Sequence, residues 1–191
     1  DSWQSLLSPW LGESSVIPNP VPSVPVSTER NRTQFLLMGR SNPMKGQEMA
    51  MDATRILRSR GKAVTLHLTG IVHEESGIVG HGWVDGDEKE HLMNTCGTLL
   101  SPSKWEGLSM AVIESMARGM PILASKASEG VFEKSGRIVD LKPNLFADEM
   151  EKLISGPTWK KMADAGPIEA KKYSLASVIP MWGTLYDEVA Q

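Results

Sequence analysis

The feature that most constrains this chain is a regular alternation of short apolar runs with helical patterns, which begins at residue 34. Residues 34–39 (QFLLMG) form a continuous apolar run, as is typical of strands buried on both faces. Apolar side chains then recur at helical spacing through Met49, Ala53 and Ile56, and Gly61 stands where a glycine ends a helix. Strands that alternate with helices imply crossovers and a parallel sheet. The pattern predicts an α/β fold, a Rossmann-like parallel sheet with helices on both faces and a helical C-terminal tail.

The segment before this alternation has a different character. Residues 1–33 are rich in proline and serine, and alternate prolines hold residues 17–22 extended. A short amphipathic helix is expected before them, from the spacing of Trp3, Leu6, Leu7, Trp10 and Leu11. The segment is therefore either a packed N-terminal arm or an interdomain hinge.

The composition excludes several classes of protein. The 191 residues carry 20 Lys and Arg against 23 Asp and Glu, a net charge of −3, so the chain lacks the basic excess of a nucleic-acid-binding protein. Cys96 is the single cysteine, which excludes an internal disulfide and a cysteine-based zinc site. No apolar run approaches the roughly 18 residues that cross a bilayer. We expect a cytoplasmic protein with at most a peripheral membrane association.

The loop after the first expected strand can bind an anion. Ligands of open parallel sheets bind at the carboxyl ends of strands, and here Gly39, Arg40 and Lys45 lead into the next helix. Two cations beside the amides of a helix N-terminus suit a phosphate group. The loop is neither G-x-G-x-x-G nor a Walker A sequence, which argues against a standard dinucleotide or P-loop site. Taken alone, these cations are more simply explained as solvated loop residues.

The segment 101–121 carries the strongest signal. Its helix is apolar on most sides and should be buried, yet Glu114 lies about one turn into it. An unpaired buried carboxylate costs several kcal/mol, so Glu114 needs either a protein cation or the hydroxyls of a ligand. Glu106 precedes Gly107, which permits close backbone approach to a ligand. Polyol recognition and phosphate recognition are thus predicted side by side.

The sequence of this segment resembles the motif of a known family. Glu106 and Glu114 stand at the spacing E-x₇-E, and the surrounding P-S-x-x-E-G-L-S-x-x-x-x-E-S-M-A-x-G-x-P resembles the signature of retaining glycosyltransferases of the GT-B fold, the large family four group. Further segments agree in order along the chain: residues 17–21, 35–46, 82–84, 136–139 and 173–186. The first of these resembles the interdomain linker I-P-N-G-V, with Pro20 in place of the usual glycine.

The resemblance implies the C-terminal domain that binds a nucleoside diphosphate sugar, of UDP or GDP type, with no metal and no cofactor. It implies that Glu106 is the catalytic side chain facing the donor sugar, that Glu114 binds the ribose hydroxyls, and that Val84 lies at the base. The positions implied for the donor diphosphate are Gly39, Arg40, Lys45, Gly107, Leu108 and Ser109.

It also implies a division of the chain. Residues 1–33 would be the interdomain linker or N-terminal arm, residues 34–172 the nucleotide-sugar-binding domain, and residues 173–191 a helix packing back toward an N-terminal acceptor domain. Because that domain is not in the sequence, which begins at Asp1, we expect one half of an enzyme that binds nucleotide but transfers no sugar alone.

Two other functions and one apparent metal motif are considered beside this predicted function. The alternatives are a noncatalytic nucleotide-sugar-binding or partner-interaction module, and a GT-B relative such as a nucleotide-sugar epimerase or a phosphorylase. The apparent metal motif is Asp85-Gly86-Asp87, which matches the pattern D-x-D. It falls just before an expected helix, where Asp85 is better explained as an N-cap.

Overall fold

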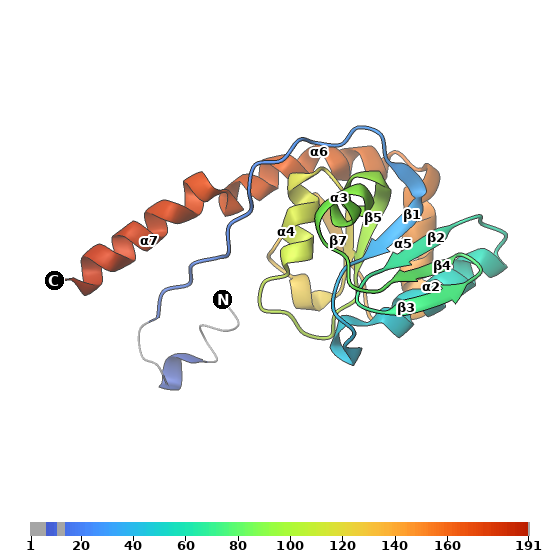
Figure 1. Ribbon diagram of the computed structural model, residues 1–191, viewed down its shortest axis with the longest axis horizontal. Helices are drawn as coiled ribbons and strands as arrows, with labels where there is room; N and C mark the ends of the chain where they lie inside the picture. Colours follow the sequence, from blue (N-terminus) through green and yellow to red (C-terminus); the bar gives the residue numbers. More distant parts are fainter. Residues whose placement is uncertain (1–6, 11–13, 191) are drawn as a thin grey trace.

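The structure, a computed structural model that describes residues 7–10 and 14–190, contains a seven-stranded sheet in the order β3-β4-β2-β1-β5-β6-β7 (Figure 1). Neighbouring strands pair in parallel except β3 and β4, which are antiparallel. The strands are β1 (Asn31–Leu37), β2 (Thr65–Leu68), β3 (Val72–Glu75), β4 (Ile78–His81), β5 (Cys96–Ser101), β6 (Ile122–Ala124) and β7 (Gly136–Ile138). The expected Rossmann-like parallel sheet is confirmed.

Helices cover both faces of this sheet. They are α2 (Gln47–Ser59), α3 (Gly86–Thr95), α4 (Met110–Ala117), α5 (Pro143–Ser155), α6 (Thr158–Ala170) and α7 (Leu175–Val189), with 3-10 turns at Pro43–Lys45, Lys126–Ser128 and Lys171–Tyr173. Phe35 and Leu36 are adjacent on β1 and both fully buried, but Phe35 joins the core that includes α2 and α5 whereas Leu36 joins the core that includes α3 and α4. A strand whose side chains pack into a core on each face has no polar face, which explains its continuous apolar run.

Element boundaries differ from the expected ones by a few residues. β1 begins at Asn31, three residues before the expected position 34. The apolar pattern predicts another strand over residues 78–84, but β4 ends at His81, which leaves Val84 on the following loop. Gly61 follows the C-cap residue Arg60 of α2 with φ +80°, as a glycine that ends a helix should. The helix expected near the N-terminus falls partly outside the described residues, because Trp3, Leu6 and Leu11 are not described; residues 7–10 are helical.

The N-terminal segment is tied to the body of the domain. The backbone N–H of Val21 donates to the carbonyl of Tyr173 at 2.8 Å, and the Ser27 hydroxyl donates to the carbonyl of Asn94 at 2.8 Å. The guanidinium of Arg30 donates to three backbone carbonyls, those of residues 93, 96 and 118, at 2.7 to 2.9 Å. Described residues 14–30 thus run along the domain as an extended arm.

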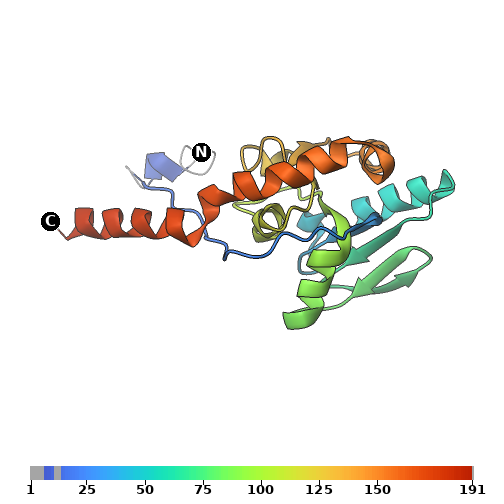
Figure 2. The ribbon, with the colours of Figure 1, turned by 90° about the horizontal axis from the view of Figure 1, so that it is seen from above.

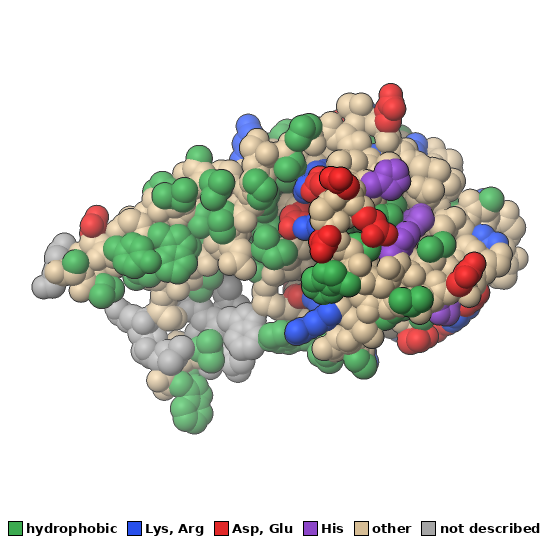
Figure 3. All heavy atoms as spheres, in the orientation of Figure 1, with side chains coloured by type: hydrophobic (Ala, Val, Ile, Leu, Met, Phe, Trp, Pro, Cys, Tyr) green, Lys and Arg blue, Asp and Glu red, His purple; other side chains and the backbone are tan. Residues whose placement is uncertain are grey.

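Helix α7 projects away from the sheet (Figures 1 and 2). It buries Val178, whereas Ile179, Trp182 and Tyr186 are 60%, 44% and 67% exposed. Apolar side chains gather along this helix in the space-filling view (Figure 3). None of the helices within residues 7–10 and 14–190 is long and apolar enough to cross a membrane.

The thiol of Cys96 offers a test of the packing. Cys96 is fully buried at the start of β5, and desolvation raises its pKa to about 12, an effect that the nearby Arg30 opposes in part. Because the thiolate is the reactive form, we expect no reaction with a thiol reagent such as dithionitrobenzoate at pH 8 in the native protein. One equivalent should react after unfolding in guanidinium chloride. Rapid native labelling would contradict this packing of β5.

Candidate functional site

The chain reverses the direction in which it adds strands at β1. It runs from β1 to β2 and β4 on one side, then returns to β5 on the other side of β1. A crevice for ligands forms at the carboxyl ends of the strands at such a switch point. The loops that flank it are residues 38–46 after β1 and 102–109 after β5. These are the two loops in which the sequence predicts the site.

The two loops touch through their backbones. The N–H of Lys104 donates to the carbonyl of Met44 at 2.8 Å. Gly46 ends the 3-10 turn with φ +74°, a left-handed conformation that favours glycine. A Cβ at Gly46 would overlap the carbonyl oxygen of Pro102 and lie 3.1 Å from its carbonyl carbon. Close backbone packing therefore fixes the spacing of the loops.

A lysine and a glutamate meet across this loop contact. Lys45 Nζ lies 2.6 Å from Glu106 Oε1, and the Ser103 hydroxyl donates to the same oxygen at 2.7 Å. The side chains of Lys45 and Glu106 are 26% and 10% exposed, so water only partly screens the pair. The Ser103 carbonyl in turn accepts a hydrogen bond from the hydroxyl of Ser125, which follows β6. Glu106 is thereby held in place by residues from three loops.

The two cations of the first loop differ in their surroundings. The Lys45 stem packs on Gly39, where a Cβ would lie 3.3 Å from Lys45 Cγ and Cδ. The Arg40 side chain is exposed, and only its backbone carbonyl is engaged, by Gln47 Nε2 at 2.9 Å. Among the described residues Arg40 forms no ion pair. Lys45 is thus built into the site, and Arg40 stands at its surface.

Glu114 has a protein cation as its partner. It lies in α4 with its side chain 17% exposed, and Lys89 Nζ from α3 lies 2.8 Å from its Oε2. Of the two partners that the sequence left open, the structure shows the cation. Val84, which is 9% exposed, lies just before α3, the helix that carries Lys89.

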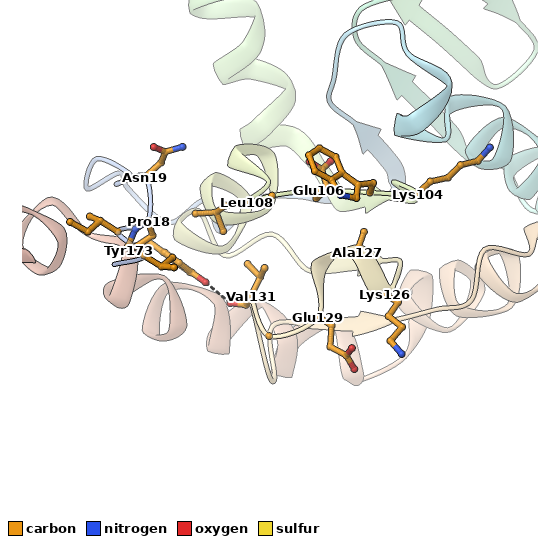
Figure 4. Close-up of a pocket in the computed structure, with 15 residues that line it drawn as sticks. Pro18, Asn19, Lys104, Glu106, Leu108, Lys126, Ala127, Glu129, Val131 and Tyr173 are labelled. Atoms are coloured by element: carbon orange, nitrogen blue, oxygen red, sulfur yellow. Dashed lines mark hydrogen bonds between the residues drawn. The ribbon is translucent and has the colours of Figure 1, made fainter. Parts of the chain in front are cut away.

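A cleft of about 1030 Å³ lies between the N-terminal arm and the loops after β5 and β6 (Figure 4). Its walls are formed by Val16, Ile17, Pro18, Asn19, Lys104, Trp105, Glu106, Gly107, Leu108, Lys126, Ala127, Glu129, Gly130, Val131 and Tyr173. Tyr173 is anchored there by its hydroxyl, which donates to the carbonyl of Val131 at 3.1 Å. The arm side of the cleft is largely apolar, and the opposite side carries charges of both signs.

The structure brings part of the predicted site to this cleft. Glu106, Gly107 and Leu108 line it, and Lys45 reaches it through its contact with Glu106. The other predicted positions stand outside its walls: Gly39, Arg40, Val84, Ser109 and Glu114. Ser109 is the buried N-cap residue of α4, although its side chain makes no cap hydrogen bond.

Sequence reasoning missed several residues of the site. Lys89 gives no signal of its own, because one lysine on a helix surface is ordinary until its partner on another helix is known. Lys126, Glu129 and Tyr173 reach the cleft from the loop after β6 and from the turn before α7. Among the described residues, no group of three or more His, Cys, Asp or Glu is arranged to hold a metal ion. Asp85 takes the N-cap position of α3 but forms no side-chain cap bond.

Solved structures share this fold. Staphylococcus aureus TarM, in a complex with fondaparinux, α-GlcNAc-glycerol and UDP, has a TM-score of 0.85 at 17% identity over 97% of this chain and 42% of TarM. The pneumococcal O-GlcNAc transferase GtfA, in a complex with UDP and GlcNAc, has a TM-score of 0.84 at 14% identity over 100% of this chain and 43% of GtfA. The C-terminal domain of the group 1 glycosyl transferase LpcC from Francisella tularensis has a TM-score of 0.70 at 17% identity over 80% of this chain and 97% of that one.

Curated relatives match at low identity and over part of their lengths. A 41.2 kDa protein of the Klebsiella pneumoniae cps region is 23% identical over 59% of this chain and 37% of its own length. A glycosyltransferase of Haemophilus influenzae is 35% identical over 42% and 25%. A pancreatic lipase-related protein 2 of Myocastor coypus is 28% identical over 63% and 25%. This sequence contains no G-x-S-x-G motif.

This chain therefore spans between a quarter and two fifths of those curated relatives. The family model described as glycosyl transferases group 1 matches residues 32–156, well over half of the chain. That range contains both loops of the switch point and all of the predicted site residues. The chain belongs to the glycosyl transferases group 1 family, and its fold is the Rossmann-like C-terminal half of a GT-B glycosyltransferase.

Proposed function

We propose that the chain is the donor-binding domain of a retaining glycosyltransferase, which takes a UDP- or GDP-sugar and transfers its hexosyl group to a glycan, lipid or small-molecule acceptor. The observation that carries the proposal is the Lys45–Glu106 contact at the switch point, beside a cleft of about 1030 Å³. The cleft has room for the sugar that Glu106 would face, whereas the positions proposed for the ribose and the base, Glu114 and Val84, lie outside its walls. Membership of the glycosyl transferases group 1 family supports glycosyl transfer.

The charges of the site suit the leaving group of such a reaction. As the glycosidic C–O bond breaks, negative charge grows on the nucleoside diphosphate and must be stabilised. Lys45 supplies a positioned cation, and Arg40 supplies a second one on the same loop. The backbone amides of residues 107–109 add the positive end of the α4 dipole. In this proposal the chain stabilises the diphosphate without a metal or a cofactor.

The two glutamates take different parts of the donor. Glu106 faces the sugar, where its carboxylate orients the ring and stabilises the positive charge that develops at the anomeric carbon. Its contacts with Lys45 and Ser103 hold it in one position for that task. Glu114 binds the ribose hydroxyls, and the base lies near Val84 at the start of α3.

The proposal assigns the acceptor to a domain outside this sequence. The chain covers 42% of TarM and 43% of GtfA. The exposed apolar side chains of α7, Ile179, Trp182 and Tyr186, would pack against that N-terminal domain. In this division residues 1–33 are the linker, residues 34–172 bind the donor, and residues 173–191 reach back to the acceptor domain.

Titration calorimetry with UDP, GDP and their glucose conjugates tests the proposal. We expect saturable binding of one nucleotide family and at least a roughly tenfold loss for Glu114→Ala, because a charge-assisted hydrogen bond is removed. Glu149→Ala is the matched control, since Glu149 on α5 is also 17% exposed and pairs with Lys152 at 2.7 Å. It should bind nucleotide like the wild type.

Three results would decide against parts of this function. If no nucleotide binds, the donor-binding role is wrong. If the chain alone transfers sugar at a substantial rate, the division into half-enzymes is wrong. Nucleotide binding without transfer, even when an N-terminal acceptor domain is joined to the chain, would favour the noncatalytic alternative.

A further inference from the structure

Two ion pairs of opposite polarity join α3 to α4. Lys89 of α3 pairs with Glu114 of α4 at 2.8 Å, and Glu90 of α3 pairs with Arg118, the C-cap residue of α4, at 2.6 Å. Arg118 is deeply placed, with its side chain 6% exposed, and also donates to the carbonyl of Glu114 at 3.3 Å. Glu90 thus neutralises the nearly buried guanidinium of Arg118 and links α3 to the end of α4.

The Lys89–Glu114 pair occupies a different position. Glu114 lies in the second turn of α4, the helix that begins after the Glu106 loop, and α3 begins immediately after Val84 and Asp85. The pair therefore joins the helix that follows Val84 to the helix that follows the Glu106 loop, the two segments proposed to hold the base and the sugar. That is where a ribose must lie if both proposals hold.

The chemistry of the pair suits the recognition of a diol. Two neighbouring hydroxyls can donate to the two oxygens of one carboxylate, and they do so with less loss of conformational freedom when its plane is already fixed. The ammonium of Lys89 contacts Oε2 at 2.8 Å and restricts rotation of the carboxylate. No other described residue forms an ion pair with Glu114, so its second oxygen has no competing cation.

We propose that Lys89 is a positioning residue which orients Glu114 toward the ribose hydroxyls and so makes the site selective for ribonucleotides over 2′-deoxyribonucleotides. This inference rests on the proposed function, because it requires the nucleotide to bind at Glu114. A lysine that only joined two helices would affect both kinds of nucleotide alike.

The test is titration of UDP against 2′-deoxy-UDP, and of GDP against 2′-deoxy-GDP, with three proteins. The wild type should prefer the ribonucleotide by about tenfold, because one charge-assisted hydrogen bond is at stake. Lys89→Met keeps the length of the stem and removes the charge, and should reduce this preference to about twofold. Lys89→Arg should restore most of it, because a guanidinium can take the same place beside the carboxylate.

Glu90→Gln provides the matched control, since it breaks the other ion pair between the same two helices. It should leave the preference for ribose unchanged, whatever it does to the melting temperature. The inference is overturned if Lys89→Met keeps the full preference, or if Glu90→Gln reduces it equally. A wild type that binds neither nucleotide would contradict the proposed function itself, whereas ribonucleotide binding with no effect of Lys89→Met contradicts this inference alone.

Discussion

Lys45→Met should weaken the binding of UDP or GDP by about 30-fold, measured by titration calorimetry at low salt. A hydrogen bond to a charged group contributes about 1.5–3 kcal/mol, and each 1.4 kcal/mol changes the dissociation constant about tenfold. Methionine retains an unbranched stem to pack on Gly39, so the loop keeps its contact while the cation is lost. Because the missing contact is ionic, the difference from the wild type should shrink as salt is added.

Two further variants give this prediction its controls. Lys62 precedes β2, at the opposite end of the strands from the site, and its Nζ lies 2.9 Å from Glu151 Oε1. The variant Lys62→Met also removes a paired lysine and should bind UDP normally. Glu106→Gln should bind UDP at least as tightly as the wild type, because it releases Lys45 and removes a negative charge near the diphosphate. A large loss of UDP binding in Glu106→Gln would instead assign that side chain to the nucleotide.

The sheet could be predicted because its strands are buried on both faces. A short, continuous apolar run such as residues 34–39, placed between helical patterns, is typical of a strand buried on both faces. β3 (Val72–Glu75) was missed for the opposite reason: it is an edge strand, Val72 is 89% exposed, and its remaining residues are His and Glu. Such a strand exists because its antiparallel partner β4 supplies hydrogen bonds, which no hydrophobic pattern reports.

The site could be predicted only as far as its loops. The ligand sites of parallel sheets lie in the loops after the strands, so the sequence pointed to these two loops, but their contact, in which Lys45 meets Glu106 across 61 residues of sequence, was found only in the structure. Contacts that depend on helix placement could not be found in this way. The partner of Glu114 is Lys89, 25 positions earlier on another helix, and the arm residues 16–19 face the cleft because Val21 is bonded to Tyr173.

Gly46→Ala should lower the melting temperature by about 12 °C, which corresponds to about 4 kcal/mol for a domain of this length. About 1–2 kcal/mol of that loss comes from placing a Cβ at φ +74°. The rest comes from the clash with the Pro102 carbonyl, which is backbone and cannot rotate away as a side chain would. If the loop after β5 moves to relieve the clash, the Lys104–Met44 hydrogen bond must lengthen.

Gly61→Ala separates the two causes of this loss. Gly61 has a similar φ of +80°, but a Cβ there would meet nothing within 4 Å, so its cost is the left-handed conformation alone, about 1 kcal/mol or roughly 3 °C. Gly46→Ala should also weaken UDP binding, because the shift separates Lys45 from Glu106, whereas Gly61→Ala should not. Equal losses of melting temperature in the two variants would mean that the loops do not pack through Gly46. A destabilised Gly46→Ala that still binds UDP normally would mean that the spacing of the loops does not control the site.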